Sequence, residues 1–104
     1  MERLAFKMTL LPGCAAAYKK RHEEIWPEIS ALLKTAGVSD YSIYLDVQTD
    51  TLFATMKIAD RRMLDALADE KVMRQWWNYM SDMVLSNADG IPVLTNLTEL
   101  FHLS

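Results

Sequence analysis

Apolar and polar residues alternate along three segments of this chain, and such alternation predicts β-strands with one inward face. The first segment covers residues 3–10, and the second and third cover residues 41–46 and 51–58. Only residues 47–50 separate the second segment from the third, which predicts that these two strands form a hairpin. Residues 97–103 are predicted to form the last strand.

Two longer segments carry apolar residues at steps of three and four, which predicts helices with one inward face. The first covers residues 15–36, and Pro27 must kink or divide it, because proline lacks an N–H and its ring crowds the preceding turn. Gly37 is well placed to end this helix. Asp60 could cap a short helix that runs through residue 68. The second long helical segment covers residues 72–84.

The predicted order of strand, helix, strand, strand, helix, strand is the split βαβ arrangement of ferredoxin-like α+β folds. Helices would then cover one face of a four-stranded antiparallel sheet. Tyr44, Phe53 and Leu100 fall out of phase with the apolar residues of their own strands, so the other sheet face is also partly apolar. Because two sheets packed face to face would cover these residues, we expect a homodimer of single-domain subunits, residues 1–104.

The length and charge of the chain limit its number of domains and the kinds of partner that it can bind. A chain of 104 residues fits one domain, and its 11 basic and 14 acidic residues give a net charge of −3, which argues against a nucleic-acid-binding protein. No apolar run approaches the roughly 20 residues of a membrane helix, and the first residues lack the features of a signal peptide. Cys14 is the only cysteine, so no internal disulfide can form and a reducing cytoplasm is expected.

His22 is the first candidate for chemistry. Tyr18 lies four residues before it, so both side chains share one helix face, about 6 Å apart. The apolar stripe continues from this pair, which places it inward or at the rim of a cleft. A lone histidine in such a place is more often a hydrogen-bonded core residue. The functional interpretation is a general acid or base that changes charge near neutral pH.

Aromatic residues supply the other candidates. Adjacent helical residues point about 100° apart, so one of Trp76 and Trp77 can join the core while the other turns toward its edge. Such a pair is usually core, but it also makes a broad wall that suits the C–H face of a sugar. Tyr41 begins a predicted strand, which would place its hydroxyl near a sheet edge.

Several classes of site lack support in the sequence. Two distant histidines and one cysteine offer no metal-ligand spacing, and three glycines form no phosphate-binding loop, so we expect neither a metal nor a cofactor. No Ser-His-Asp or Cys-His arrangement is evident. The charged residues 19–21 and 23–24 are expected to form a solvated helix face with local ion pairs.

Three segments carry a resemblance to a known family. Arg-His-Glu-Glu-Ile-Trp-Pro-Glu at residues 21–28 resembles the "RHxxIWPE" segment of the L-rhamnose mutarotase family. Asp-Tyr-Ser-Ile-Tyr-Leu-Asp at residues 40–46 resembles its "NYSIYLD" strand, and residues 74–80 resemble its tryptophan-pair helix. The resemblance covers essentially the whole chain in register.

This resemblance implies a dimeric α+β barrel that interconverts the α and β anomers of L-rhamnose without a metal or nicotinamide. It implies that His22 is the proton donor of the reaction. It also implies that Tyr18, Tyr41, Trp76 and Trp77 bind the sugar.

Two alternatives stay open at this point. One is a different enzyme on the same barrel, either a cofactor-free monooxygenase or a haem-degrading enzyme with His22 or His102 as ligand. The other is a non-catalytic sugar-binding or dimerisation module.

Overall fold

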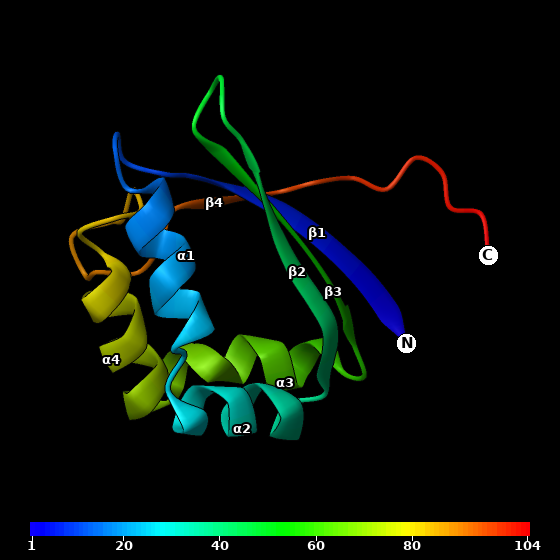
Figure 1. The fold of residues 1–104 in the computed structure, drawn as a ribbon. Coiled ribbons are helices and arrows are strands. Elements are labelled where there is room, and N and C mark those ends of the chain that lie inside the picture. The colour runs from blue at the N-terminus through cyan, green and yellow to red at the C-terminus, as the bar shows by residue number, and fades with distance from the viewer.

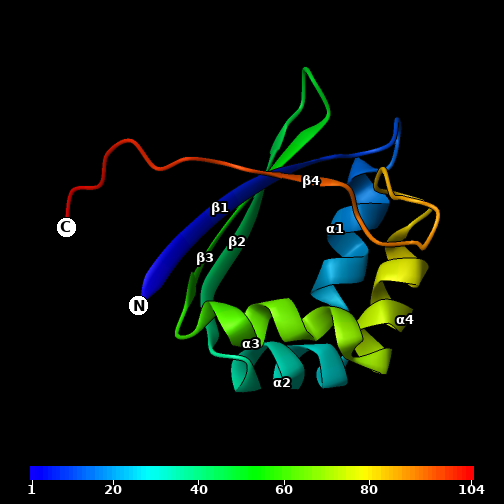
Figure 2. The same cartoon turned by 180° about the vertical axis from the view of Figure 1, so that it is seen from behind.

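Four antiparallel strands form one sheet in the order β2-β3-β1-β4, and the helices lie on one of its faces (Figure 1). The computed structural model describes residues 1–104. Its elements, in chain order, are β1 (Glu2–Thr9), α1 (Ala15–Glu23), α2 (Pro27–Thr35), β2 (Val38–Asp46), β3 (Thr51–Ile58), α3 (Arg61–Asp65), the 3₁₀ helix η1 (Ala66–Asp69), α4 (Lys71–Met80) and β4 (Leu94–Asn96). Helices α1 and α4 run side by side, and α2 and α3 form a second pair near the end of the sheet (Figures 1 and 2).

Alternation along β3 sets which sheet face is buried, as its sequence predicts. Four residues of β3 point toward the helices and are buried, namely Leu52, Ala54, Met56 and Ile58. The residues between them are exposed on the opposite face. β3 pairs along its full length with β1, from Glu2 opposite Ile58 to Thr9 opposite Thr51. The predicted hairpin of β2 and β3 is also confirmed.

Pro27 divides the first predicted helix into two. α1 ends at Glu23, Trp26 adopts an extended conformation (φ −58°, ψ 132°), and Pro27 opens α2, where its missing N–H costs no hydrogen bond. Gly37 follows α2 with φ +85°, a left-handed conformation that glycine adopts readily. A Cβ at Gly37 would lie 2.9 Å from the Cβ of Ala59, so this turn has no room for a side chain.

Two predicted elements differ from the structure near the C-terminus. The helix predicted over residues 72–84 ends at Met80, because the chain turns there and Val84 bridges to Leu10 beside the sheet. The strand predicted over residues 97–103 is wrong, since β4 is the short segment Leu94–Asn96. Asp60 caps α3 as predicted, and its side chain accepts a hydrogen bond from the backbone N–H of Arg62.

β4 ends at Asn96 although β1 continues beyond it. Asn96 lies opposite Phe6, so four residues of β1, Glu2–Ala5, have no partner in β4. One backbone hydrogen bond follows, from the N–H of Leu97 to the carbonyl of Ala5 (2.8 Å), and Glu99 forms an ion pair with Arg3 (2.8 Å). Beyond these contacts the tail extends away from the rest of the chain (Figures 1 and 2).

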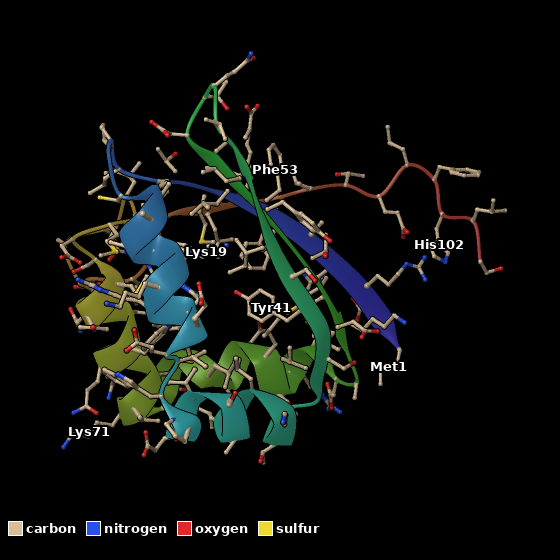
Figure 3. The ribbon with its side chains drawn as sticks, viewed as in Figure 1. Met1, Lys19, Tyr41, Phe53, Lys71 and His102 are labelled. Carbon is tan, nitrogen blue, oxygen red and sulfur yellow. The ribbon has the colours of Figure 1, made fainter.

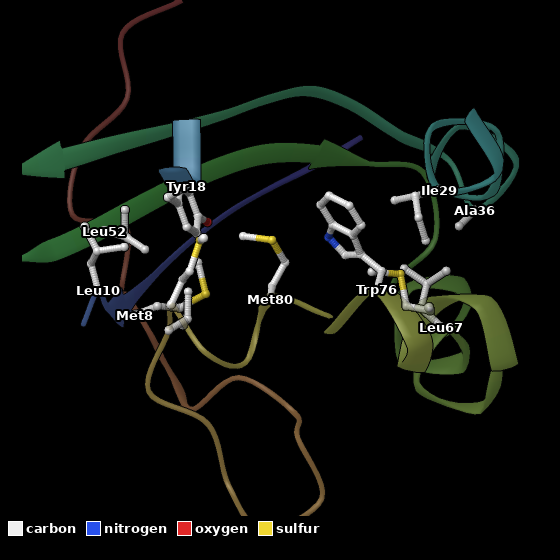
Figure 4. Packing of buried hydrophobic residues seen from close by; sticks show 12 residues of the cluster. Met8, Leu10, Tyr18, Ile29, Ala36, Leu52, Leu67, Trp76 and Met80 are labelled. Carbon is white, nitrogen blue, oxygen red and sulfur yellow. The ribbon is translucent and has the colours of Figure 1, made fainter. Parts of the chain in front are cut away.

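The main core lies between the sheet and the helices (Figure 4). Leu10, Ile29 and Ile58 have the largest fully buried side chains. The opposite sheet face carries exposed apolar side chains, as the out-of-phase residues predict: Tyr44 and Phe53 are 62% and 37% exposed. None of the helices combines the length and apolar character that a membrane span requires.

Candidate active site

Tyr18 and His22 stack on each other on α1, with ring centroids 4.4 Å apart and an angle of 27° between the ring planes. Tyr18 is the one buried residue of this helix, and His22 is half-buried beside it. Nδ1 of His22 lies 3.1 Å from the backbone carbonyl oxygen of Tyr18. Because a carbonyl only accepts hydrogen bonds, Nδ1 is the donor. The neutral ring therefore presents its free lone pair on Nε2.

Burial sets the protonation states of the site. Desolvation lowers the pKa of His22, and the hydrogen bond to the Tyr18 carbonyl offsets part of this effect. Desolvation raises the pKa of Tyr18, and the neighbouring Tyr41 raises it further. Desolvation of its phenol also raises the pKa of Tyr41, to about 12, although 39% of the residue as a whole is exposed. At neutral pH the site therefore combines a neutral imidazole with two protonated phenols.

The two adjacent tryptophans differ in burial. Trp76 is 5% exposed and belongs to the core, whereas Trp77 is half-buried and packs against the margin of the core. The ring of Trp76 meets His22 edge-on, with centroids 5.6 Å apart and an angle of 81°. This division agrees with the expectation that only one of the pair would enter the core.

An irregularity in β2 accompanies the placement of Tyr41. The pairing of β2 with β3 shifts between Ser39 and Ser42, and Asp40 has a φ of +48°. Nζ of Lys57 on β3 lies 3.1 Å from Oδ2 of Asp40. Tyr41 projects from β2 into the space between the sheet and the helices (Figure 3). It lies near enough to Tyr18 to raise the pKa of that phenol. Its predicted strand position did not reveal this inward orientation.

A second set of side chains, not predicted as part of the site, surrounds Trp76. Trp26 meets Trp76 edge-on (5.1 Å between centroids) and stacks on Tyr79 (5.4 Å). Arg21 was expected on a solvated face, but it reaches α4 and forms an ion pair with Asp82. Tyr79 follows Trp76 by three residues on a helix, and this spacing is the signal that could have identified it.

His102 lies on the extended tail, away from Tyr41 (Figure 3). No three residues among the histidines, cysteines and acidic residues gather closely enough to hold a metal ion. Of the predicted site residues, Tyr18, His22, Tyr41 and Trp76 lie between the sheet and the helices, and Trp77 lies at the margin of the same core.

The sequence profile of the L-rhamnose mutarotase family matches residues 3–103. The chain belongs to the L-rhamnose mutarotase family. It is 51% identical to the L-rhamnose mutarotase of Verminephrobacter eiseniae over 102 residues, which cover 98% of this chain and 96% of the relative. It is 52% identical to the L-rhamnose mutarotase of Jannaschia sp. over 104 residues, which cover 99% of both chains.

A crystal structure within the L-rhamnose mutarotase family has the same fold. The L-rhamnose mutarotase of Formosa agariphila superposes with a TM-score of 0.94 at 44% sequence identity, covering 100% of both chains. The match confirms the predicted ferredoxin-like α+β fold, and membership confirms the resemblance noted in the three sequence segments.

Proposed function

We propose that this chain interconverts the α and β anomers of L-rhamnose, with His22 as the proton-transferring residue. Tyr18, Tyr41, Trp76 and Trp77 are the proposed sugar-binding residues. The observation that carries the proposal is the environment of His22, which is half-buried, stacked on Tyr18 and hydrogen-bonded so that Nε2 is free. Membership of the L-rhamnose mutarotase family identifies the substrate.

The reaction requires one proton acceptor and one proton donor. Nε2 of His22 accepts the proton of the anomeric hydroxyl while a phenol, from Tyr18 or Tyr41, donates a proton to the ring oxygen. The bond between the anomeric carbon and the ring oxygen breaks, and the anomeric C–O becomes the aldehyde carbonyl. After rotation of the aldehyde, the ring closes on its other face. His22 then donates its proton to the new anomeric oxygen, and the phenolate regains one from the closing hydroxyl.

Protonation states and aromatic surfaces suit these steps. A neutral histidine and a protonated phenol are the base and acid forms that the opening step consumes, and positioned proton transfer contributes about 10²- to 10⁴-fold to a rate. Trp76 and Trp77 offer apolar surface to the ring C–H groups and the methyl group of the deoxy sugar. Rotation of the aldehyde requires that the protein contacts the anomeric end weakly and binds the rest of the sugar more tightly.

Polarimetry tests the activity. A single crystalline anomer of L-rhamnose, freshly dissolved, should reach its equilibrium rotation faster with the protein than in buffer alone. The same experiment with L-fucose and other deoxy sugars measures the substrate preference. An unchanged relaxation rate for L-rhamnose would refute the proposed function.

The acid limb of the pH–rate profile should have its midpoint below the ordinary histidine pKa of about 6.5. The reason is that desolvation lowers the pKa of His22, so the neutral form persists as the pH falls and is lost only near the lowered pKa. Initial rates of anomer exchange between acidic and neutral pH measure this limb. NMR titration of the His22 ring should give the same midpoint, and a midpoint above 6.5 would contradict the assignment.

We also propose that two copies associate through the sheet face that the helices leave uncovered. Tyr44 and Phe53 lie directly opposite each other on β2 and β3, on that face, and both are exposed. Leu100, on the tail, is 94% exposed. A twofold axis would bring the same patch of a second copy against these side chains, as in other homodimers. Each copy would be a single domain, residues 1–104, and the unpaired Cys14 fits a reducing cytoplasm.

Phe53→Lys should convert the proposed homodimer to monomers, because it places a charge at the centre of the apolar contact. Size-exclusion chromatography with light scattering measures the mass directly. Met63→Lys is the matched control, since Met63 is a similarly exposed apolar residue (46%) on α3 and outside the sheet. Equal masses for Phe53→Lys and wild type, both dimeric, would place the interface elsewhere.

A further inference from the structure

Arg21 holds the end of α1 against the end of α4 through three kinds of contact. Its Nη1 donates hydrogen bonds to the backbone carbonyl of Tyr79 (2.6 Å) and to Oδ1 of Asp82 (2.9 Å). Its Nη2 donates to Oδ2 of Asp82 (3.2 Å), which completes a two-bond fork. The guanidinium carbon also lies 4.2 Å from the centre of the Tyr79 ring, within cation–π range.

These contacts matter because α1 has few other anchors. Tyr18 is its only buried residue, and no side chain caps its N-terminus. Helix α1 has only nine residues, too few to be stable without tertiary contacts. The carbonyl of Tyr79 belongs to the last turn of α4, where backbone carbonyls lack helical partners. Arg21 therefore donates a hydrogen bond to an unpaired carbonyl at the end of α4 and links α1 to that end.

A continuous series of aromatic contacts leads from Arg21 to His22. The ring of Tyr79 beneath the guanidinium stacks on Trp26, with centroids 5.4 Å apart. Trp26 meets Trp76 edge-on at 5.1 Å, and Trp76 meets His22 edge-on at 5.6 Å. Tyr79 also contacts Trp76 directly, at 5.8 Å. His22 follows Arg21 in the chain, so both the backbone and the rings connect the ion pair to the histidine.

We propose that Arg21 is a positioning residue for the mutarotase reaction, because its fork to Asp82 and its contact with Tyr79 fix the orientation of the His22 ring against Trp76. Arg21 acts through these rings and does not itself handle a proton. This inference rests on the proposed function, in which Nε2 of His22 must meet the anomeric hydroxyl. A misplacement of about 1 Å at a reacting group can cost about 100-fold in rate.

The test is Arg21→Ala, assayed by anomer exchange and by NMR of the His22 ring. We expect kcat to fall about 10- to 100-fold with a smaller change in KM, because proton transfer by His22 is more sensitive to a small displacement than the apolar contacts of Trp76 with the sugar. The His22 ring protons should shift, since they leave the ring-current field of Trp76 and Tyr18. Arg21→Lys keeps the charge but cannot form the fork, so it should give a smaller loss of the same kind.

Arg62→Ala is the matched control. It removes an exposed arginine–aspartate pair, Arg62 with Asp60, and leaves the backbone cap of α3 intact. If Arg21→Ala lowers kcat no more than this control does, or leaves the His22 signals in place, the proposal is wrong. If Arg21→Ala fails to fold, the same two measurements on Arg21→Lys decide. A wild-type protein without anomer exchange would refute the proposed function, whereas the ring shifts would still test the role of Arg21.

Discussion

Replacing His22 by glutamine lowers the rate of anomer exchange about 10²- to 10⁴-fold, the usual contribution of one positioned acid–base group. Glutamine has a similar length and a polar amide, but it cannot exchange a proton near neutral pH. KM should change little, because the aromatic residues proposed to bind the sugar remain. NMR exchange rates at several L-rhamnose concentrations separate kcat from KM.

His102→Gln is the matched control for this substitution. His102 is the only other histidine of the chain and is exposed on the tail, away from Tyr41. It should retain the wild-type rate. If His22→Gln is as active as wild type, His22 has no catalytic role and the acid–base pair must be sought among the tyrosines.

Alanine at Trp76 should destabilise the fold by about 3–5 kcal/mol, the usual cost of removing a buried tryptophan. Trp76 is 5% exposed and contacts the rings of His22, Trp26 and Tyr79, so its removal leaves a cavity beside the catalytic histidine. Because small domains have about 5–15 kcal/mol of stability in total, the loss should be large in a urea unfolding curve.

Trp77→Ala is the companion substitution, because the same side chain is removed from a half-buried position on the same helix. It should cost less stability than Trp76→Ala and mainly raise KM, since Trp77 is proposed to pack against the sugar. Equal losses of stability at the two positions would contradict the placement of Trp76 in the core and Trp77 at its margin.

Local patterns predicted most of the fold. The alternation in β3 and the position of Pro27 depend on neighbouring residues, and both predictions are confirmed. The tail was mispredicted because strand pairing is non-local: residues 97–103 have a strand-like pattern, but regular pairing of β4 with β1 ends at Asn96, opposite Phe6. The end of α4 likewise depends on the bridge between Val84 and Leu10, which are far apart in sequence.

The site residues also divide into those that local spacing predicts and those that depend on contacts between distant residues. Tyr18 and His22 share a helix face, so their stacking follows from a spacing of four residues. The inward orientation of Tyr41 accompanies an irregularity in β2 that involves Asp40 and Lys57 from different strands. The bond between Arg21 and Asp82 joins residues 61 positions apart, and no local pattern distinguishes Arg21 from its solvated neighbours.

Saturation-transfer NMR on L-rhamnose tests the central claim most directly. Saturating the anomeric proton of one anomer should reduce the signal of the other when wild-type protein is present, at a rate proportional to protein concentration and well above that of buffer. The account predicts this transfer near neutral pH and its loss in His22→Gln. A wild-type exchange rate equal to that of buffer would contradict it.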